Sequence, residues 1–183
     1  MKVKDVILKA CDFIGKDELA LALSSSGELS AEQQVLKESL VKYFNLVREE
    51  IANEFQPIMQ AEKFIVRNFK LSFSDFSKPL QEIYAVKDKF GRNVNYKIFE
   101  DYIFVCGREV EVIYSSVATP LAFDGEFSSS LPERIYAYGV AREYYFINNL
   151  FEEANVWEGR FKGALEIMLR RKSEVKIPQR RWI

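Results

Sequence analysis

The spacing of apolar residues changes twice along this chain of 183 residues, and no other feature constrains its fold as strongly. Apolar side chains recur at helical spacing up to about residue 55, at every second residue within 62–116, and at helical spacing again from residue 131. No helix interrupts the middle stretch, so its strands are expected to pair antiparallel. The sequence therefore predicts one α+β domain over residues 1–172, with a sheet inserted between helices.

The N-terminal part is predicted to be helical over residues 3–55. Residues 3–14 have the pattern of a short amphipathic helix, with Gly15 as its C-cap. Ser30 and Gln33 have the spacing of a capping box, in which each side chain satisfies a backbone amide of the first helical turn. A long helix over residues 31–55 should follow, ending before Pro57.

The middle part is predicted to form antiparallel strands within 62–116. Residues 62–69 and 71–73 have extended patterns, and two hairpins are expected after them. One hairpin joins 81–87 to 93–99 through a glycine-bearing loop, and the other joins 102–106 to 109–114 around Gly107. Residues 109–114 alternate between polar and apolar, which predicts one buried and one solvent-facing side.

Two further helices are predicted over residues 131–172. Pro132 and Glu133 mark the first start, and the polar pair Asn148-Asn149 should separate the two helices. Gly159 and Gly163 lie in the second helix, where each glycine costs about 1 kcal/mol relative to alanine. We expect this cost to be offset by a close approach of another element rather than by a kink. The expected packing residues are Trp157, Gly159, Phe161 and Gly163.

The residue types argue against catalysis. The chain contains no histidine, which removes the commonest general base and the commonest metal ligand. Its glycines form neither a phosphate-binding loop nor a dinucleotide fingerprint. The carboxylate pairs Glu49-Glu50 and Glu152-Glu153 are adjacent on helices, so the two members point about 100° apart. A serine–lysine arrangement stays open, although no spacing favours it. We expect no enzyme activity, no cofactor and no metal.

The cysteine usage and the apolar runs indicate where the protein is made. Cys11 and Cys106 lack the spacing of paired ligands, and we expect two free, buried thiols in a reducing compartment. No apolar run is long enough to span a bilayer, and the first residues lack the apolar core of a signal peptide. The expectation is a soluble protein made inside the cell, without a membrane partner.

Charge is distributed unevenly between the body and the C-terminal segment. Residues 160–183 carry eight Lys and Arg against two Glu, a net charge of +6, which leaves −7 on residues 1–159 of a chain whose total is −1. Residues 173–183 are predicted to be an extended basic docking tail, because Pro178 stops the helix and the apolar side chains need a partner to cover them. A frayed terminus and nucleic-acid binding are the alternatives. The candidate docking residues are Lys176, Ile177, Pro178, Arg180, Arg181, Trp182 and Ile183.

Three runs in the C-terminal helices resemble those of one protein family. They are LPERIYAYGVAREY at 131–144, LFEEA at 150–154 and WEGRF at 157–161. Together with the strand 109–114, the loop at Pro120, the long helix 30–55 and the closing Ile177-Pro178-x-Arg180-Arg181-Trp182, they resemble the head-to-tail adaptors of tailed bacteriophages, which are also called head completion or connector proteins. The resemblance covers most of the chain.

The resemblance implies a non-enzymatic structural protein of the virion neck, made in the bacterial host cytoplasm. Copies of such adaptors, commonly twelve, form a ring on the portal protein and extend the DNA channel towards the tail. The implied partners are the portal, tail or neck proteins and copies of the chain itself, with DNA passing through without sequence-specific binding. An acidic channel wall would let DNA slide. The alternative is a nucleic-acid-binding or regulatory protein that uses its basic tail, and a cryptic enzyme is the third hypothesis.

Overall fold

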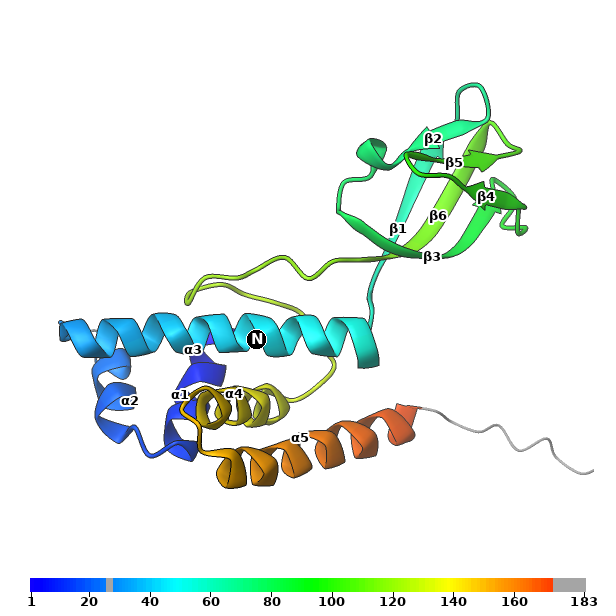
Figure 1. The fold of residues 1–183 in the computed structure, drawn as a ribbon. Coiled ribbons are helices and arrows are strands. Elements are labelled where there is room, and N and C mark those ends of the chain that lie inside the picture. Colours follow the sequence, from blue (N-terminus) through cyan, green and yellow to red (C-terminus); the bar gives the residue numbers. More distant parts are fainter. Residues whose placement is uncertain (26–27, 173–183) are drawn as a thin grey trace, which may run out of the picture. The chain divides into compact units, whose positions relative to one another are not determined.

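The computed structural model of the chain describes residues 1–25 and 28–172 (Figure 1), so the predicted docking tail lies outside the described residues. The described part is α+β, as expected, with helices and two antiparallel sheets. It divides into two compact units: a helical unit, Met1–Arg48 with the chain from Pro120 onward, and a sheet unit, Glu49–Thr119. The inserted strands of the sheet unit enclose a hydrophobic core of their own.

The helical unit contains the helices at the two ends of the chain. They are α1 (Val3–Phe13), α2 (Asp17–Ser24), α3 (Ala31–Glu50), α4 (Glu133–Ile147) and α5 (Phe151–Lys172).

Several predicted helix ends are confirmed. Gly15 follows α1 with a φ of +67°, a left-handed conformation that suits a glycine C-cap. The Gln33 backbone amide donates to Ser30 Oγ at 3.2 Å, and the Ser30 backbone amide donates to Gln33 Oε1 at 3.0 Å. These two hydrogen bonds complete the capping box. The long helix differs in its last turn, since α3 ends at Glu50 and a π-helical turn (Ile51–Phe55) continues the chain.

Helix α4 is the centre of the helical unit. All seven residues from Ile135 to Ala141 are buried, and α4 packs against both α1 and α5. Gly139 lies against α3, because a Cβ atom there would be 2.5 Å from Cγ1 of Val47. Close packing in this unit therefore requires a glycine at position 139.

The sheet unit consists of two three-stranded antiparallel sheets. One has the order β1-β6-β3 and the other β2-β5-β4. Their strands are β1 (Ile58–Ile65), β2 (Lys70–Ser72), β3 (Leu80–Asp88), β4 (Tyr96–Ile98), β5 (Tyr102–Val105) and β6 (Glu109–Ser116).

The antiparallel direction is confirmed. The first predicted hairpin is confirmed only beside its loop, where Lys87 pairs with Asn93 and the Val94 amide donates to the Val86 carbonyl at 2.8 Å, and the second predicted hairpin, around Gly107, is wrong. β6 pairs with β1 and β3, whereas β5 pairs with β2 and β4. The segment 106–108 therefore carries the chain from one sheet to the other instead of closing a hairpin. Val105 is buried, so strand alternation turns the next side chain outward, and Cys106 is exposed where a buried thiol was predicted.

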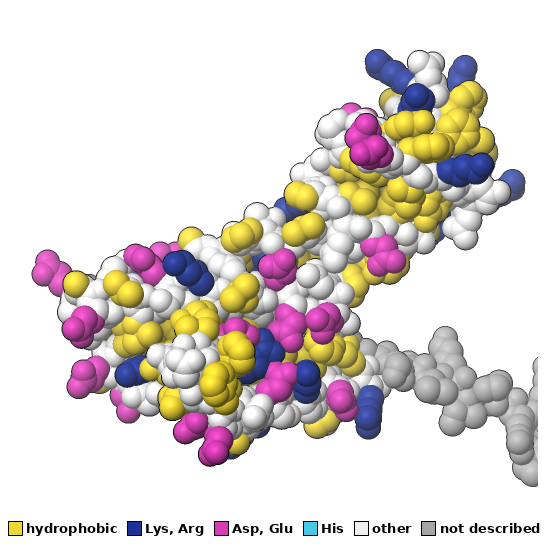
Figure 2. All heavy atoms as spheres, viewed as in Figure 1, with side chains coloured by type: hydrophobic (Ala, Val, Ile, Leu, Met, Phe, Trp, Pro, Cys, Tyr) yellow, Lys and Arg dark blue, Asp and Glu magenta, His cyan; other side chains and the backbone are white. Residues whose placement is uncertain are grey.

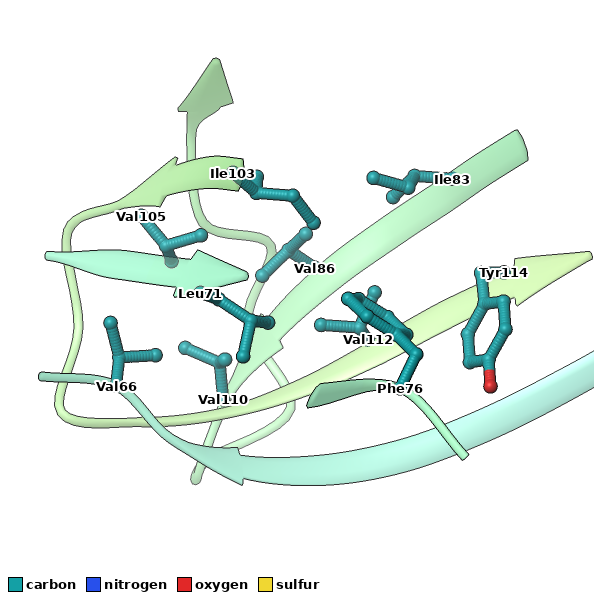
Figure 3. Packing of buried hydrophobic residues seen from close by; sticks show 10 residues of the cluster. All are labelled: Val66, Leu71, Phe76, Ile83, Val86, Ile103, Val105, Val110, Val112 and Tyr114. Atoms are coloured by element: carbon teal, nitrogen blue, oxygen red, sulfur yellow. The ribbon is translucent and has the colours of Figure 1, made fainter. Parts of the chain in front are cut away.

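The hydrophobic core of the sheet unit lies between its two sheets (Figure 3). Val110, Val112 and Tyr114 reach it from alternate positions of β6, as the predicted alternation requires. The inner side chains of the opposite sheet are Leu71 from β2 and Ile103 and Val105 from β5. Each sheet of this unit thus has one inner face and one outer face.

Candidate docking surfaces

An aromatic cluster holds α5 onto α1 and α4. The Trp157 ring stacks on Phe13 with centroids 5.0 Å apart, and Tyr138 lies within 5.3 Å of Phe13 and 5.6 Å of Trp157. The Arg160 guanidinium lies over Trp157, 4.7 Å from its centroid, and Arg134 lies over Tyr138 at 5.1 Å. Two cations are therefore fixed beside the aromatic side chains at the start of α4 and the middle of α5.

A buried aromatic ring and an ion-pair network fix the register of α4 and α5. Phe161 is fully buried, with the Arg142 guanidinium 5.0 Å from its centroid. The same guanidinium donates to Glu158 at 2.8 Å, and Lys162 pairs with the other Glu158 oxygen at 2.6 Å. Desolvation raises the pKa of Glu158, but the hydrogen bonds and charges of Lys162 and Arg142 outweigh it and lower the pKa below its usual value.

Gly159 and Gly163 do not have the packing role that the sequence suggested. A Cβ atom built on either residue meets no atom within 4 Å in the described part of the chain. They instead line a hollow of about 430 Å³, which we call the glycine hollow, between the start of α4 and the middle of α5. Its other lining residues are Pro132, Arg134, Ile135, Tyr138, Arg160, Ala164, Ile167 and Met168.

A second apolar surface lies at the opposite end of α4, where the chain turns into α5. Four large apolar side chains are between 43% and 57% exposed here, and we call this surface the hairpin knob. Two exposed carboxylates, Glu152 and Glu153, follow it directly on the first turn of α5. The members of the knob are Phe146, Ile147, Leu150 and Phe151.

The two surfaces carry charges of opposite sign. The glycine hollow is a concavity with the guanidinium groups of Arg134 and Arg160 at its wall, and the hairpin knob is a turn with carboxylates beside it. Trp157 and Phe161, which the sequence singled out, support the helices behind these surfaces. The sequence analysis missed the knob, although the unbroken apolar run Tyr144–Ile147 covers more than one helix face and could have indicated it.

Figure 2 shows apolar side chains reaching the surface of both units. Within the described residues, no group of three or more Cys, Asp or Glu side chains could hold a metal ion. None of the helices described here combines the length and apolar character needed to cross a membrane.

No family model matches the chain, and no curated protein matches it either. The function must therefore be inferred from the surfaces themselves.

Proposed function

We propose that this chain is a head-to-tail adaptor of a tailed bacteriophage, a non-enzymatic protein whose copies form a ring on the portal and extend the DNA channel. The observation that carries the proposal is the pair of complementary surfaces on one helical unit. A ring requires a heterologous interface, in which one patch of each subunit binds a different patch of the next. The glycine hollow and the hairpin knob are two such patches.

In the proposed ring, the hairpin knob of one subunit enters the glycine hollow of its neighbour. The absence of side chains at Gly159 and Gly163 makes room for the large knob residues, whose exposed apolar area is then removed from water. Glu152 and Glu153 would approach Arg134 and Arg160, which orients the neighbour and favours a single docking direction. In this proposal the basic tail, residues 173–183, binds the portal.

Mixing two variants tests this interface. Gly159→Leu fills the hollow and leaves the knob intact, whereas Phe146→Ser with Phe151→Ser removes the knob and leaves the hollow intact. With the portal protein of the same phage, negative-stain images should show rings for the unaltered chain and none for either variant. The mixed variants should form pairs in sedimentation experiments, because each pair retains one good interface.

Leu46→Ser provides the matched control, since Leu46 is 52% exposed and belongs to neither surface. It should leave ring formation unchanged. Rings that form equally well with both altered subunits would exclude the knob-and-hollow interface. A complete failure of the unaltered chain to associate with portal would exclude the adaptor function.

A further inference from the structure

The outer face of the β2-β5-β4 sheet carries aromatic and basic side chains in two rows. In the first row, Phe104 of β5 lies between Lys70 of β2 and Lys97 of β4. In the second row, Tyr102 lies two residues before Phe104 on β5, beside Phe99, whose backbone amide donates to the Tyr102 carbonyl at 2.9 Å. Ile103 and Val105 point to the core, so this face is the one turned to solvent.

The rings on this face are arranged for further stacking. Phe99 stacks on Tyr102 with centroids 4.8 Å apart and planes only 11° from parallel, yet Phe99 remains 44% exposed. The Lys70 ammonium lies 4.6 Å from the Tyr102 centroid, which places a cation within reach of the same stack.

The turn before β2 adds an aromatic side chain at a conformational cost. Asn68 and Phe69 have φ values of 53° and 60°, and the Lys70 amide donates to the Arg67 carbonyl at 3.0 Å, as in a type I′ turn. The second central position of this turn favours glycine, but here it holds a phenylalanine that is 56% exposed and lies 5.9 Å from Phe104. Packing in the core cannot account for this residue, because the core does not contain it.

Charge on this face is polarised along the strands. Arg67 pairs with Lys70 across the turn, so one exposed arginine extends the row of Lys70 and Lys97. Two acidic residues lie beside the other row. The Asp75 carboxylate accepts a hydrogen bond from the Ser72 backbone amide, and the Asp101 carbonyl accepts one from the Phe73 backbone amide. A polyanion would therefore be attracted to the row of Lys70 and Lys97 and repelled from the side of the face near Asp75 and Asp101.

From this juxtaposition we propose that the outer face of the β2-β5-β4 sheet binds single-stranded nucleic acid. Unpaired bases stack on Phe69 and Phe99, and the phosphates follow the row of Lys70 and Lys97. Exposed aromatic rings on a sheet with cations beside them suit bases, because every base has a flat face that can stack without sequence preference. An acidic peptide would satisfy the cations but would leave the rings without a stacking partner. Duplex DNA keeps its bases paired and is excluded from the rings.

Fluorescence anisotropy of the full chain with a labelled oligothymidylate tests the proposal, beside an oligouridylate and a duplex of equal length. Phe69→Gly and Phe99→Ala should each weaken single-strand binding by about tenfold. Phe69→Gly suits the left-handed backbone, so its thermal melt should show an intact fold. Replacing Lys70 and Lys97 together by Gln should reduce the slope of log K against log salt by about 1.4.

The matched controls are Phe146→Ala, an equally exposed phenylalanine of the helical unit, and Lys42→Gln, an exposed lysine of α3. Both variants should retain the affinity for single strands. Phe146→Ala should impair ring formation, so the test of single-strand binding is independent of the test of the ring interface. Equal binding of duplex, or unchanged binding by Phe69→Gly and Phe99→Ala, would overturn the proposal. The proposal would also be overturned if Arg180→Gln together with Arg181→Gln abolished single-strand binding. Competition by polyglutamate as strong as that by single-stranded nucleic acid would overturn it too.

Discussion

At the scale of single residues, the glycines of the helical unit have opposite surroundings. A Cβ atom at position 139 would lie 2.5 and 2.8 Å from the two methyl groups of Val47, whereas one at 159 would meet no atom of the described residues within 4 Å. Gly139→Ala should therefore destabilise the protein by about 1–3 kcal/mol through overpacking. Gly159→Ala should stabilise it by up to about 1 kcal/mol through helix propensity. Thermal and urea denaturation of both variants measures the difference, and similar effects of the two substitutions would contradict it.

The same comparison shows why the sequence pointed to the wrong glycines. The spacing of Gly159 and Gly163 suggested a packing site, but spacing does not show whether another helix or strand packs against that side of α5. The useful signal was around Gly139, where the unbroken small or apolar run Tyr136–Ala141 predicts burial on every side of α4. A glycine inside such a run is in contact with neighbours whatever their direction.

The two thiols should differ in reactivity. Cys11 is fully buried, and burial, together with Asp12 and Asp17, raises its pKa to about 11, which disfavours the reactive thiolate. Cys106 is exposed. Titration of the native protein with a chromogenic disulfide should show one fast thiol, and denaturant should release the second. Cys106→Ser should remove the fast phase, whereas a fast phase that persists in this variant would assign the reactivity to Cys11.

At the scale of elements, the sequence predicted strands better than their partners. The alternation of Glu109–Tyr114 correctly indicates one buried side, since it depends only on neighbouring residues. The pairing of β6 with β1 joins residues such as Glu62 and Val112, which are far apart in the chain. Local turn signals such as Gly107 cannot specify those partners. For the same reason the sequence did not predict the outer face of the β2-β5-β4 sheet, because its two rows form only when β2, β4 and β5 pair.

A carboxylate ties β1 to β6 and to the loop after β2, and it should make stability pH-dependent. Glu62 accepts hydrogen bonds from the Tyr114 hydroxyl and from the hydroxyl and amide of Ser77. Desolvation raises the pKa of Glu62, but these hydrogen bonds outweigh it and lower the pKa below its usual value of 4.5. The stabilisation is therefore present above pH 4.5 and is lost as the pH falls through the lowered pKa.

Thermal melts across this pH range test the role of Glu62. Glu62→Gln should lower the melting temperature at neutral pH and reduce its decline in acid, because the variant has no carboxylate to protonate. Glu109→Gln, which changes an exposed carboxyl group at the start of β6, should follow the acid profile of the unaltered chain. Parallel acid profiles for the unaltered chain and Glu62→Gln would show that Glu62 does not contribute.

At the scale of the whole molecule, the sequence specified the order of helices and strands but not the division into two units. That division depends on where apolar side chains meet, and the ten residues of the sheet core all come from within Glu49–Thr119. Composition could not reveal this, since 48% hydrophobic residues suffice for one core or for two. The two units also separate the proposed roles, with ring contacts on the helices and single-strand binding on a sheet.

The last prediction concerns the tail, whose docking role in the proposed adaptor is separable from folding. Among the residues of α5 whose burial is described, the buried ones are Ala154, Phe161 and Leu165, all well before residue 173. Deleting residues 176–183 should therefore change the melting temperature little, while it abolishes or strongly weakens co-sedimentation with portal rings. Trp182→Ala should reproduce much of this loss, because one aromatic side chain in a partner pocket can contribute about 2–4 kcal/mol of binding energy.

Arg180→Lys separates charge from geometry in that contact. Lysine keeps the positive charge but cannot donate in parallel to a carboxylate, so a small effect would indicate charge alone and a large effect a bidentate contact. Unimpaired portal binding by the truncated chain would refute the docking role. A collapsed melting temperature would instead assign the segment to the fold, because residues that serve only a partner contribute nothing to the stability of the free protein.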